Sequence, residues 1–156
     1  MVGKVQKEIK QGKPFRSLQE EVFINILLTA DTLSRSLSEL LKTAGLTPAQ
    51  YNVLRILRGA GECGHACREI GDRMITKDPD VTRLLDRMED RGLVSRARDE
   101  RDRRVITVRV TPKGLGLLAE LDAEIDRFDR KLFEHMSERQ LSKLCDLLES
   151  ARERAG

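Results

Sequence analysis

The sequence predicts a mostly helical protein that carries one small β-hairpin. Charged residues make up 35% of the 156-residue chain and aromatic residues 3%, so the core must be aliphatic, as it is between amphipathic helices. Apolar residues recur at helical spacing along most of the chain, and this period changes to two near residues 94–110. A chain of this length fits one domain, or one subunit of a small oligomer.

A basic segment precedes the first long helix. Residues 1–16 lack an apolar face, so we expect a loose arm, and they carry five basic residues against one acidic residue. Ser17 and Glu20 form a capping-box pattern that opens a helix over residues 17–43. The apolar stripe of this helix comprises Val22, Ile26, Leu33, Leu37, Leu40 and Leu41. The helix is too long for a small core alone.

The central lobe is expected over residues 47–111. Its first helix opens with a Thr47–Gln50 capping box, runs to about Arg58, and is closed by Gly59 and Gly61. Residues 64–74 form the next helix, in which Ala66, Ile70 and Met74 are spaced to pack on the helix that follows.

The following helix presents an exposed face suited to a groove. Thr76 and Asp78 are its candidate caps, Pro79 suits its first position, and Gly92 ends it in a left-handed conformation. Its buried side comprises Val81, Leu84, Leu85 and Met88, and its outward side comprises Thr82, Arg83, Asp86, Arg87 and Asp90.

A two-stranded charged hairpin, the wing, follows Gly92. Val94, Arg96 and Arg98 alternate, and alternation returns over residues 105–110. Residues 94–113 carry seven basic and three acidic side chains. Net charge is +3 for the whole chain, so this local concentration is more informative, and it favours a polyanionic partner.

Two further helices are expected over residues 112–154. Thr111-Pro112 starts the first, whose apolar stripe runs from Leu115 to Met136. Ser137 and Gln140 form a capping box for the second, which Leu141, Leu144, Leu147 and Leu148 stripe as far as about Arg152. These helices carry more apolar surface than the lobe can cover, so a second copy of the chain is the expected partner, with folding back on the same subunit as the alternative.

The wing carries a family resemblance. Asp102-Arg103-Arg104, followed after five residues by Val110-Thr111, resembles the wing signature of the MarR family of winged helix-turn-helix regulators, in which leucine is usual at the position of Val110. The run from Val81 to Met88, with Gly92-Leu93-Val94 after it, is similar to that family's recognition helix and its exit. The likeness extends over about residues 18–154.

The resemblance implies a winged helix-turn-helix with long N- and C-terminal dimerisation helices. It implies a homodimeric transcription regulator on a pseudo-palindromic double-stranded operator, acting as a repressor that a small aromatic or lipophilic effector releases. It places Arg104 in the minor groove and makes Asp102 the carboxylate that orients the wing. The full set of expected DNA contacts is Thr76, Lys77, Thr82, Arg83, Arg87, Arg101, Asp102, Arg103 and Arg104.

Simpler interpretations stay open for these charges. Arg83 and Arg87 lie one turn apart beside Asp86 and Asp90, as in solvated ion pairs along a surface helix. A charged hairpin tip also serves solubility. A winged-helix module that binds a protein partner instead of DNA is a further alternative.

Cys63, His65 and Cys67 form the other notable cluster. Two thiols and an imidazole suit a soft metal or an oxidant sensor, which gives a redox- or metal-responsive regulator as another alternative. The spacing is not that of a zinc knuckle, so we expect no metal, with Cys67 packing at a helix start and Cys145 buried beside a leucine stripe.

The sequence argues against an enzyme and against a membrane or secreted protein. The sequence lacks a recognisable nucleophile with its base, a phosphate-binding glycine loop and an identifiable cofactor site, so we expect neither an enzyme nor a cofactor. It also lacks a long apolar run and an N-terminal signal pattern. Together with three unevenly spaced cysteines, these features predict a cytoplasmic protein without a membrane partner.

Overall fold

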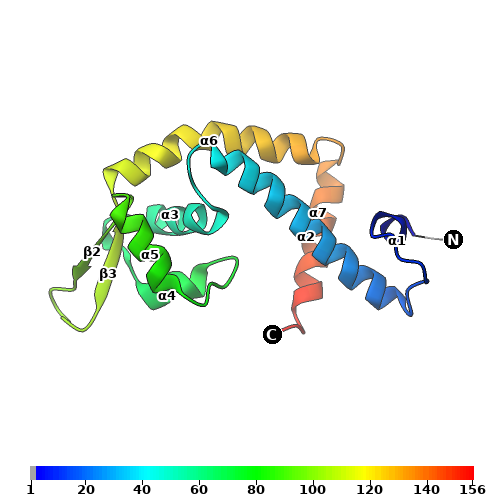
Figure 1. Cartoon of the computed structure of the whole chain (residues 1–156), viewed down its shortest axis with the longest axis horizontal. Helices are drawn as coiled ribbons and strands as arrows, with labels where there is room; N and C mark the ends of the chain where they lie inside the picture. Colours follow the sequence, from blue (N-terminus) through cyan, green and yellow to red (C-terminus); the bar gives the residue numbers. More distant parts are fainter. Residues whose placement is uncertain (1–2) are drawn as a thin grey trace. The chain divides into compact units, whose positions relative to one another are not determined.

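The computed structural model describes residues 3–156 and divides into two compact units (Figure 1). The first unit ends at Gly114, and the second is Leu115–Gly156. The first contains α1 (Lys4–Glu8), α2 (Leu18–Lys42), α3 (Pro48–Ala60), the 3-10 helix η1 (Gly61–Cys63), β1 (His65–Ala66), α4 (Cys67–Arg73), α5 (Val81–Asp90), β2 (Val94–Arg98) and β3 (Ile106–Val110). Helix α6 (Pro112–Phe133) continues into the second unit, which also holds α7 (Glu138–Arg152).

The predicted fold class, mostly helical with a small β-wing, is confirmed, and the sheet has one strand more than predicted. The described residues form an antiparallel sheet in the order β1-β3-β2, in which Val94 pairs with Val110 and Arg98 with Ile106. His65 pairs with Val108 across the other edge of β3. The prediction of helix from residue 64 is therefore wrong, because α4 begins at Cys67.

The glycine before β1 explains this extra strand. Gly64 has φ +65°, and a Cβ on this residue would collide with the carbonyl oxygen of Val108. Glycine is the residue that permits both this backbone conformation and this close approach. A two-residue strand that pairs more than 40 residues away has no periodic signal of its own.

Helix α5 begins two residues later than the sequence predicts. Asp80 is its N-cap, and the carboxylate of Asp80 accepts a hydrogen bond from the Arg83 amide at 3.0 Å. The expected cap Asp78 instead accepts from the Asp80 amide at 2.8 Å, so it shapes the turn before the helix. Gly92 does end α5 with φ +69°, and the amide of Leu93 returns to the Met88 carbonyl at 3.0 Å.

The ends of α2 and α3 also differ in detail from the prediction. Ser17 caps α2 by accepting from the Glu20 amide at 3.2 Å, but the Glu20 carboxylate binds the Arg16 amide, so the capping box is half formed. The Thr47–Gln50 capping box is complete. Gly59 lies inside α3, and Gly61 alone follows its end.

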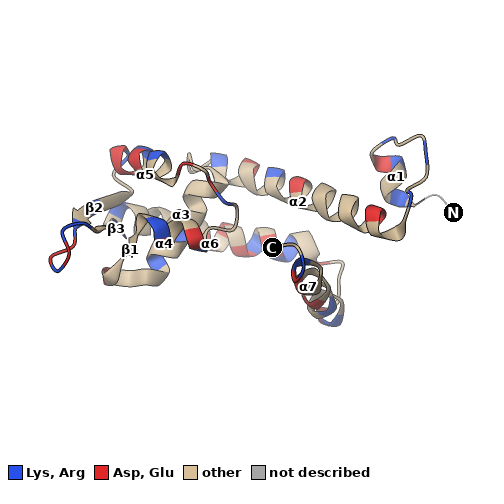
Figure 2. Ribbon diagram, turned by 90° about the horizontal axis from the view of Figure 1, so that it is seen from below, with Lys and Arg blue, Asp and Glu red and all other residues tan. Residues whose placement is uncertain are grey.

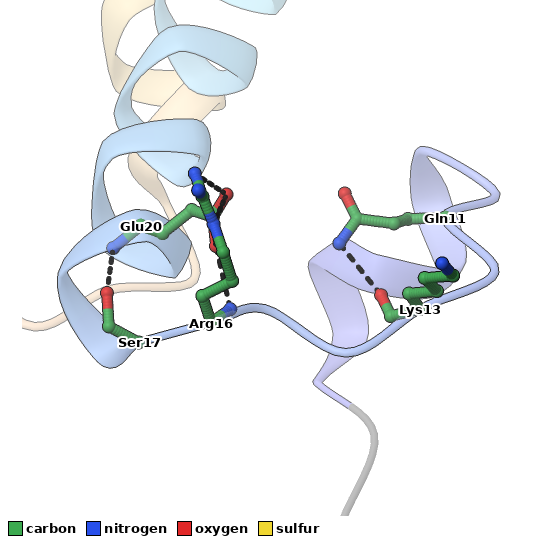
Figure 3. Close-up of polar contacts among 5 residues, drawn as sticks. All are labelled: Gln11, Lys13, Arg16, Ser17 and Glu20. Atoms are coloured by element: carbon green, nitrogen blue, oxygen red, sulfur yellow. Dashed lines mark hydrogen bonds and ion pairs between the residues drawn. The ribbon is translucent and has the colours of Figure 1, made fainter.

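The segment before α2 contains structure that its composition does not predict. Residues 4–8 form α1, in which Val5 is 4% exposed. After this helix, the side-chain amide of Gln11 donates to the Lys13 carbonyl at 2.8 Å (Figure 3). The Arg16 guanidinium lies 3.1 Å from the Glu20 carboxylate. The expectation of a loose arm is wrong for residues 4–8, because the burial of Val5 and Gln6 anchors a helix without an apolar face along the segment. Met1 and Val2 lie outside the described residues.

An aliphatic core holds the first unit together. Its fully buried side chains are Leu41, Val53, Leu54, Leu57, Ile70, Leu85, Met88, Leu93, Val94 and Val108. They come from every α-helix and both long strands between α2 and β3, so the core fixes α5 and the wing on the same scaffold.

The second unit is largely unburied. Ser137 and Gln140 complete the predicted capping box of α7, and none of the α7 residues is buried. Its leucine stripe is half-buried or exposed. No helix within residues 3–156 has the length and hydropathy of a membrane span.

Gly64 provides a stability test with a matched control. Gly61 has a similar φ of +61°, but a Cβ there meets no atom within 4 Å, so Gly61→Ala reports the cost of backbone conformation alone, about 1–3 kcal/mol. Gly64→Ala adds the collision with β3, and we expect a larger loss in the free energy of unfolding, measured by urea denaturation. Equal losses for the two variants would contradict the close pairing of β1 with β3.

Candidate nucleic-acid interface

Helix α5 presents the polar face that its sequence predicts. Leu84, Leu85 and Met88 are buried, whereas Thr82, Arg83, Asp86, Arg87 and Asp90 are exposed. Basic and acidic residues are interspersed along this helix and in the loop between β2 and β3 (Figure 2). The exposed face of a short, capped helix next to a hairpin has the dimensions of a major-groove reader.

The arginines of α5 are unpaired on this face. Within residues 3–156, no ion pair joins Arg83 or Arg87 to a carboxylate, and Asp86 binds a residue of the wing instead. The interpretation of these charges as ion pairs along one helix therefore loses its basis. Both guanidinium groups are available to an external acceptor.

Arg96 of β2 is the residue that occupies the α5 carboxylates. Its guanidinium lies 2.6 Å from the Asp86 carboxylate, and its Nε and Nη2 donate to Glu89 at 3.1 and 3.2 Å. These hydrogen bonds raise the pKa of Arg96 above its ordinary value, with Glu89 as the larger cause. Arg96 is one of the seven basic residues of segment 94–113, but its charge is paired within the protein. Its place on the same strand face as buried Val94 is the signal that marks it in the sequence.

The tip of the wing is ordered by two aspartates. Asp99 accepts hydrogen bonds from the amides of Arg101 at 2.7 Å and Asp102 at 3.1 Å, which lower the pKa of the Asp99 carboxyl. Asp102 in turn accepts from the amide of Arg104 at 3.0 Å, and the amide of Val105 donates to the Asp102 carbonyl at 2.9 Å. Sequence reasoning included Asp102 and missed Asp99, although aspartate before a turn is a known signal.

These bonds leave three wing arginines facing outward. Arg101, Arg103 and Arg104 are all exposed, and the structure brings them together on one hairpin loop. A narrow loop of guanidinium groups fits a minor groove, where negative potential is focused.

The turn before α5 holds the remaining expected contacts. Thr76 is exposed, and the Lys77 ammonium donates to the carbonyls of Gly71 at 3.2 Å and Asp72 at 2.7 Å. A cation at the C-terminal carbonyls of α4 satisfies acceptors that the helix leaves open. Lys77 thus has an internal role, and its contact with phosphate stays a prediction.

The cysteine cluster does not assemble a metal site. Among residues 3–156, no group of three or more His, Cys, Asp or Glu side chains is placed to hold a metal ion. Cys63 is exposed, while Cys67 starts α4 with its Sγ 3.7 Å from the hydroxyl of Thr82. Cys145 is exposed, so the prediction that it is buried is wrong, because α7 leaves its stripe uncovered.

A small, mostly apolar cavity lies beside the turn that leads into α5. Its volume is about 150 Å³, and the lining residues come from α2, α3 and the turn after α4. They are Ser34, Leu37, Pro48, Ala49, Tyr51, Asn52, Arg55, Met74, Ile75 and Thr76. The guanidinium of Arg55 lies 5.8 Å from the centre of the Tyr51 ring, and it is the one charged group among the lining residues. Sequence reasoning assigned none of these side chains to a pocket.

Comparison with known proteins gives consistent matches. The model of the MarR family matches residues 46–106. The transcriptional regulator TtmR of Methylorubrum extorquens is 36% identical over 69% of this chain, which spans 54% of that regulator. A crystal structure of a MarR transcription factor from Planctomyces limnophilus is 36% identical, with TM-score 0.66, over 86% of this chain and 98% of that one. The crystal structure of the regulator PcaV of Streptomyces coelicolor in complex with its natural ligand is 25% identical, with TM-score 0.70. The match covers 82% of this chain and 92% of PcaV.

The Asp99 turn generates a direct test. Asp99→Ala removes the acceptor of two wing amides, so hydrogen exchange of Arg101 and Asp102 should accelerate, whereas Glu100→Ala should leave both amides protected because Glu100 is an exposed neighbour without such bonds. Because the pKa of Asp99 is lowered in the folded chain, this protection should persist above its ordinary carboxyl pKa and disappear as the pH falls through the lowered value. Identical exchange in both variants would contradict this ordering of the tip.

Proposed function

Because this chain belongs to the MarR family of transcriptional regulators, we propose that it is a repressor that binds a pseudo-palindromic operator as a homodimer and is released by a small aromatic effector. The observation that carries the proposal is the exposure of unpaired arginines on two adjoining elements. Arg83 and Arg87 lie on α5, and Arg104 lies at the tip of the neighbouring wing.

The chemistry of these side chains assigns a different task to each element. A guanidinium on α5 forks onto the O6 and N7 acceptors of guanine in the major groove, and the hydroxyls of Thr76 and Thr82 suit phosphate oxygens. Arg104 senses minor-groove width rather than base edges. Arg101 and Arg103, which precede it in the same loop, supply phosphate contacts.

Exposed apolar surface supports the homodimer. On α2, Leu18, Phe23 and Leu27 are 71%, 61% and 51% exposed, and the stripe of α7 is also uncovered. Large apolar side chains left exposed in this number suit an interface in a soluble protein. Two copies related by a twofold axis place two recognition helices ~34 Å apart, which matches one turn of DNA.

The cavity supports the effector class. A volume of about 150 Å³ accommodates a single aromatic ring, and Arg55 offers a counter-charge for a carboxylate. Its floor includes Met74, Ile75 and Thr76 of the turn that leads into α5. A ligand that shifts this turn changes the spacing of the two recognition helices, and the dimer then loses affinity for its operator.

Repression follows from the footprint of such a dimer. A protein that covers two half-sites of an operator excludes other proteins from the same DNA. Where the operator overlaps a promoter, binding alone prevents transcription, and release by the effector restores it.

The DNA-reading assignment is tested on an operator selected from random duplexes. Arg83→Ala should cost ~1–3 kcal/mol per half-site and relax specificity at one position, while Lys77→Ala should weaken all sequences alike. Arg104→Ala should most reduce the preference for A·T-rich flanks. Arg152→Ala, a loss of charge in the last turn of α7, is the control. Unchanged operator affinity in both Arg83→Ala and Arg104→Ala, with the chain folded and dimeric, would refute the assignment.

The dimer is tested by charging its apolar face. Phe23→Glu places a carboxylate at an exposed apolar position of α2, so sedimentation equilibrium should show a monomer that binds a full operator poorly. Arg35→Gln makes the same change in charge at an exposed position of the same helix and should remain dimeric. A dimeric Phe23→Glu variant with normal operator binding would exclude this face from the interface.

The effector class is tested with benzoate and its uncharged analogue benzyl alcohol. Benzoate should lower operator affinity of the parent chain, and Arg55→Gln should reduce the response to benzoate while leaving the weaker response to benzyl alcohol. Arg35→Gln serves again as the control of charge. The same benzoate response in Arg55→Gln and in the parent chain would show that the acid binds elsewhere.

A further inference from the structure

Arg96 occupies an intermediate position on the wing. Strand alternation places Val94, Arg96 and Arg98 on the face of β2 that is directed toward α5. Val94 is buried at the base of the wing, the side chain of Arg96 is 26% exposed, and Arg98 is exposed. From Ala97 to Ile106 the hairpin contains no buried residue. Arg96 is therefore the outermost residue on this face of the wing that contacts α5.

The geometry of this contact is restrictive. The guanidinium is planar and fixes the direction of its donors, unlike the ammonium of lysine. It reaches Asp86 at 2.6 Å and Glu89 at 3.1 Å, two carboxylates spaced one turn apart on α5. A rotation of the wing about its base breaks at least one of these contacts. The three side chains thus oppose a change of angle between β2 and α5.

The opposite strand of the wing is held separately. Arg109 of β3 donates from Nε to the carbonyl of Glu62 in η1 at 2.7 Å. This bond fixes β3 to the scaffold behind it, and the contacts of Arg96 fix β2 to the recognition helix in front of it. The two attachments lie on different strands, so removal of Arg96 leaves the base of the wing in place.

We propose that Arg96 is a positioning residue that sets the angle between the wing and the recognition helix, so that Arg104 enters the minor groove when α5 is seated in the adjacent major groove. The proposal rests on the DNA binding proposed above. We assign Arg96 no DNA contact, because Asp86 and Glu89 bind its Nε and Nη2 and hold the guanidinium against α5. Its second effect is to draw the Asp86 carboxylate, which lies on the exposed face of α5, away from the phosphates.

This role predicts a particular signature in binding. Without Arg96 the recognition helix still reads its bases, but the free wing samples many angles. Restricting it to one angle on binding then costs conformational entropy. Discrimination between A·T-rich and G·C-rich flanks should therefore fall, whereas discrimination among the bases under α5 should persist. A role limited to the stability of the lobe weakens all sequences alike and leaves both preferences intact.

The experiment compares Arg96→Gln with Arg98→Gln in the full chain. Both variants remove one charge from the same face of the same strand, and Arg98 has no ion pair within residues 3–156. Affinity is measured for the selected operator with A·T-rich flanks and with G·C-rich flanks, at several salt concentrations. Hydrogen exchange of the β2 and β3 amides is followed in the free protein.

Arg96→Gln should bind the operator ~10-fold more weakly, lose as much flank preference as Arg104→Ala, and exchange its wing amides faster. Arg98→Gln should keep the flank preference and the amide protection, and should flatten the salt slope by about 1 where it meets a phosphate. The exchanged pair Arg96→Glu with Glu89→Arg should recover part of the flank preference, which Arg96→Glu alone should not.

Two results overturn the inference. One is an Arg96→Gln variant that keeps the flank preference of the parent chain, whether or not its overall affinity falls. The other is equal flank preference in Arg96→Gln and Arg98→Gln. A parent chain that binds no duplex removes the proposed function and this role together, and wing exchange in Arg96→Gln then shows whether the contact exists in the free protein.

Discussion

Hydrogen bonds around Leu93 fix the point at which the recognition helix, the wing and α6 meet. The Leu93 amide closes α5 on the Met88 carbonyl at 3.0 Å, and its carbonyl accepts from the Thr111 amide at 3.1 Å. The Thr111 hydroxyl donates to the Gly92 carbonyl at 2.6 Å and accepts from the Gly114 amide at 3.1 Å. One threonine thus joins the end of α5, the base of the wing and the first turn of α6. The end of α5 and the base of the wing therefore depend on the same few atoms, which explains why a threonine suits the end of the wing signature.

The distribution of paired and unpaired charge decides what this arrangement can bind. Four carboxylates of α5 and the wing are bound within the protein: Asp86 and Glu89 by Arg96, and Asp99 and Asp102 by main-chain amides of the wing. The arginines on the exposed faces have no such partners among the described residues. A net charge of +3 therefore understates the positive character of this surface. Pairing inside the fold, more than composition, makes it suitable for a polyanion.

Local signals in the sequence predicted most of the fold, and contacts distant in sequence account for what they missed. The Thr47 and Ser137 caps and the Gly92 terminus depend on residues within one or two turns, so the sequence pattern alone predicts them. The start of α5 was misplaced because Thr76, Asp78 and Asp80 are all acceptable caps, and tertiary structure selects the last. Strand β1, the pairing of Arg96 and the cavity around Tyr51 and Arg55 each join elements that the sequence separates. The candidate arginines could be named from the sequence, but which of them are free could not.

The central claim is that one subunit binds a major groove with α5 and the adjacent minor groove with its wing. Footprinting on a selected operator measures this directly. Dimethyl sulfate reports guanine N7 in the major groove, and hydroxyl radicals report the minor groove. The account predicts two clusters of protected guanines ~10 base pairs apart, each bordered on its outer side by a short minor-groove protection. Guanine protection without minor-groove protection, or minor-groove protection spread evenly along the duplex, would contradict it.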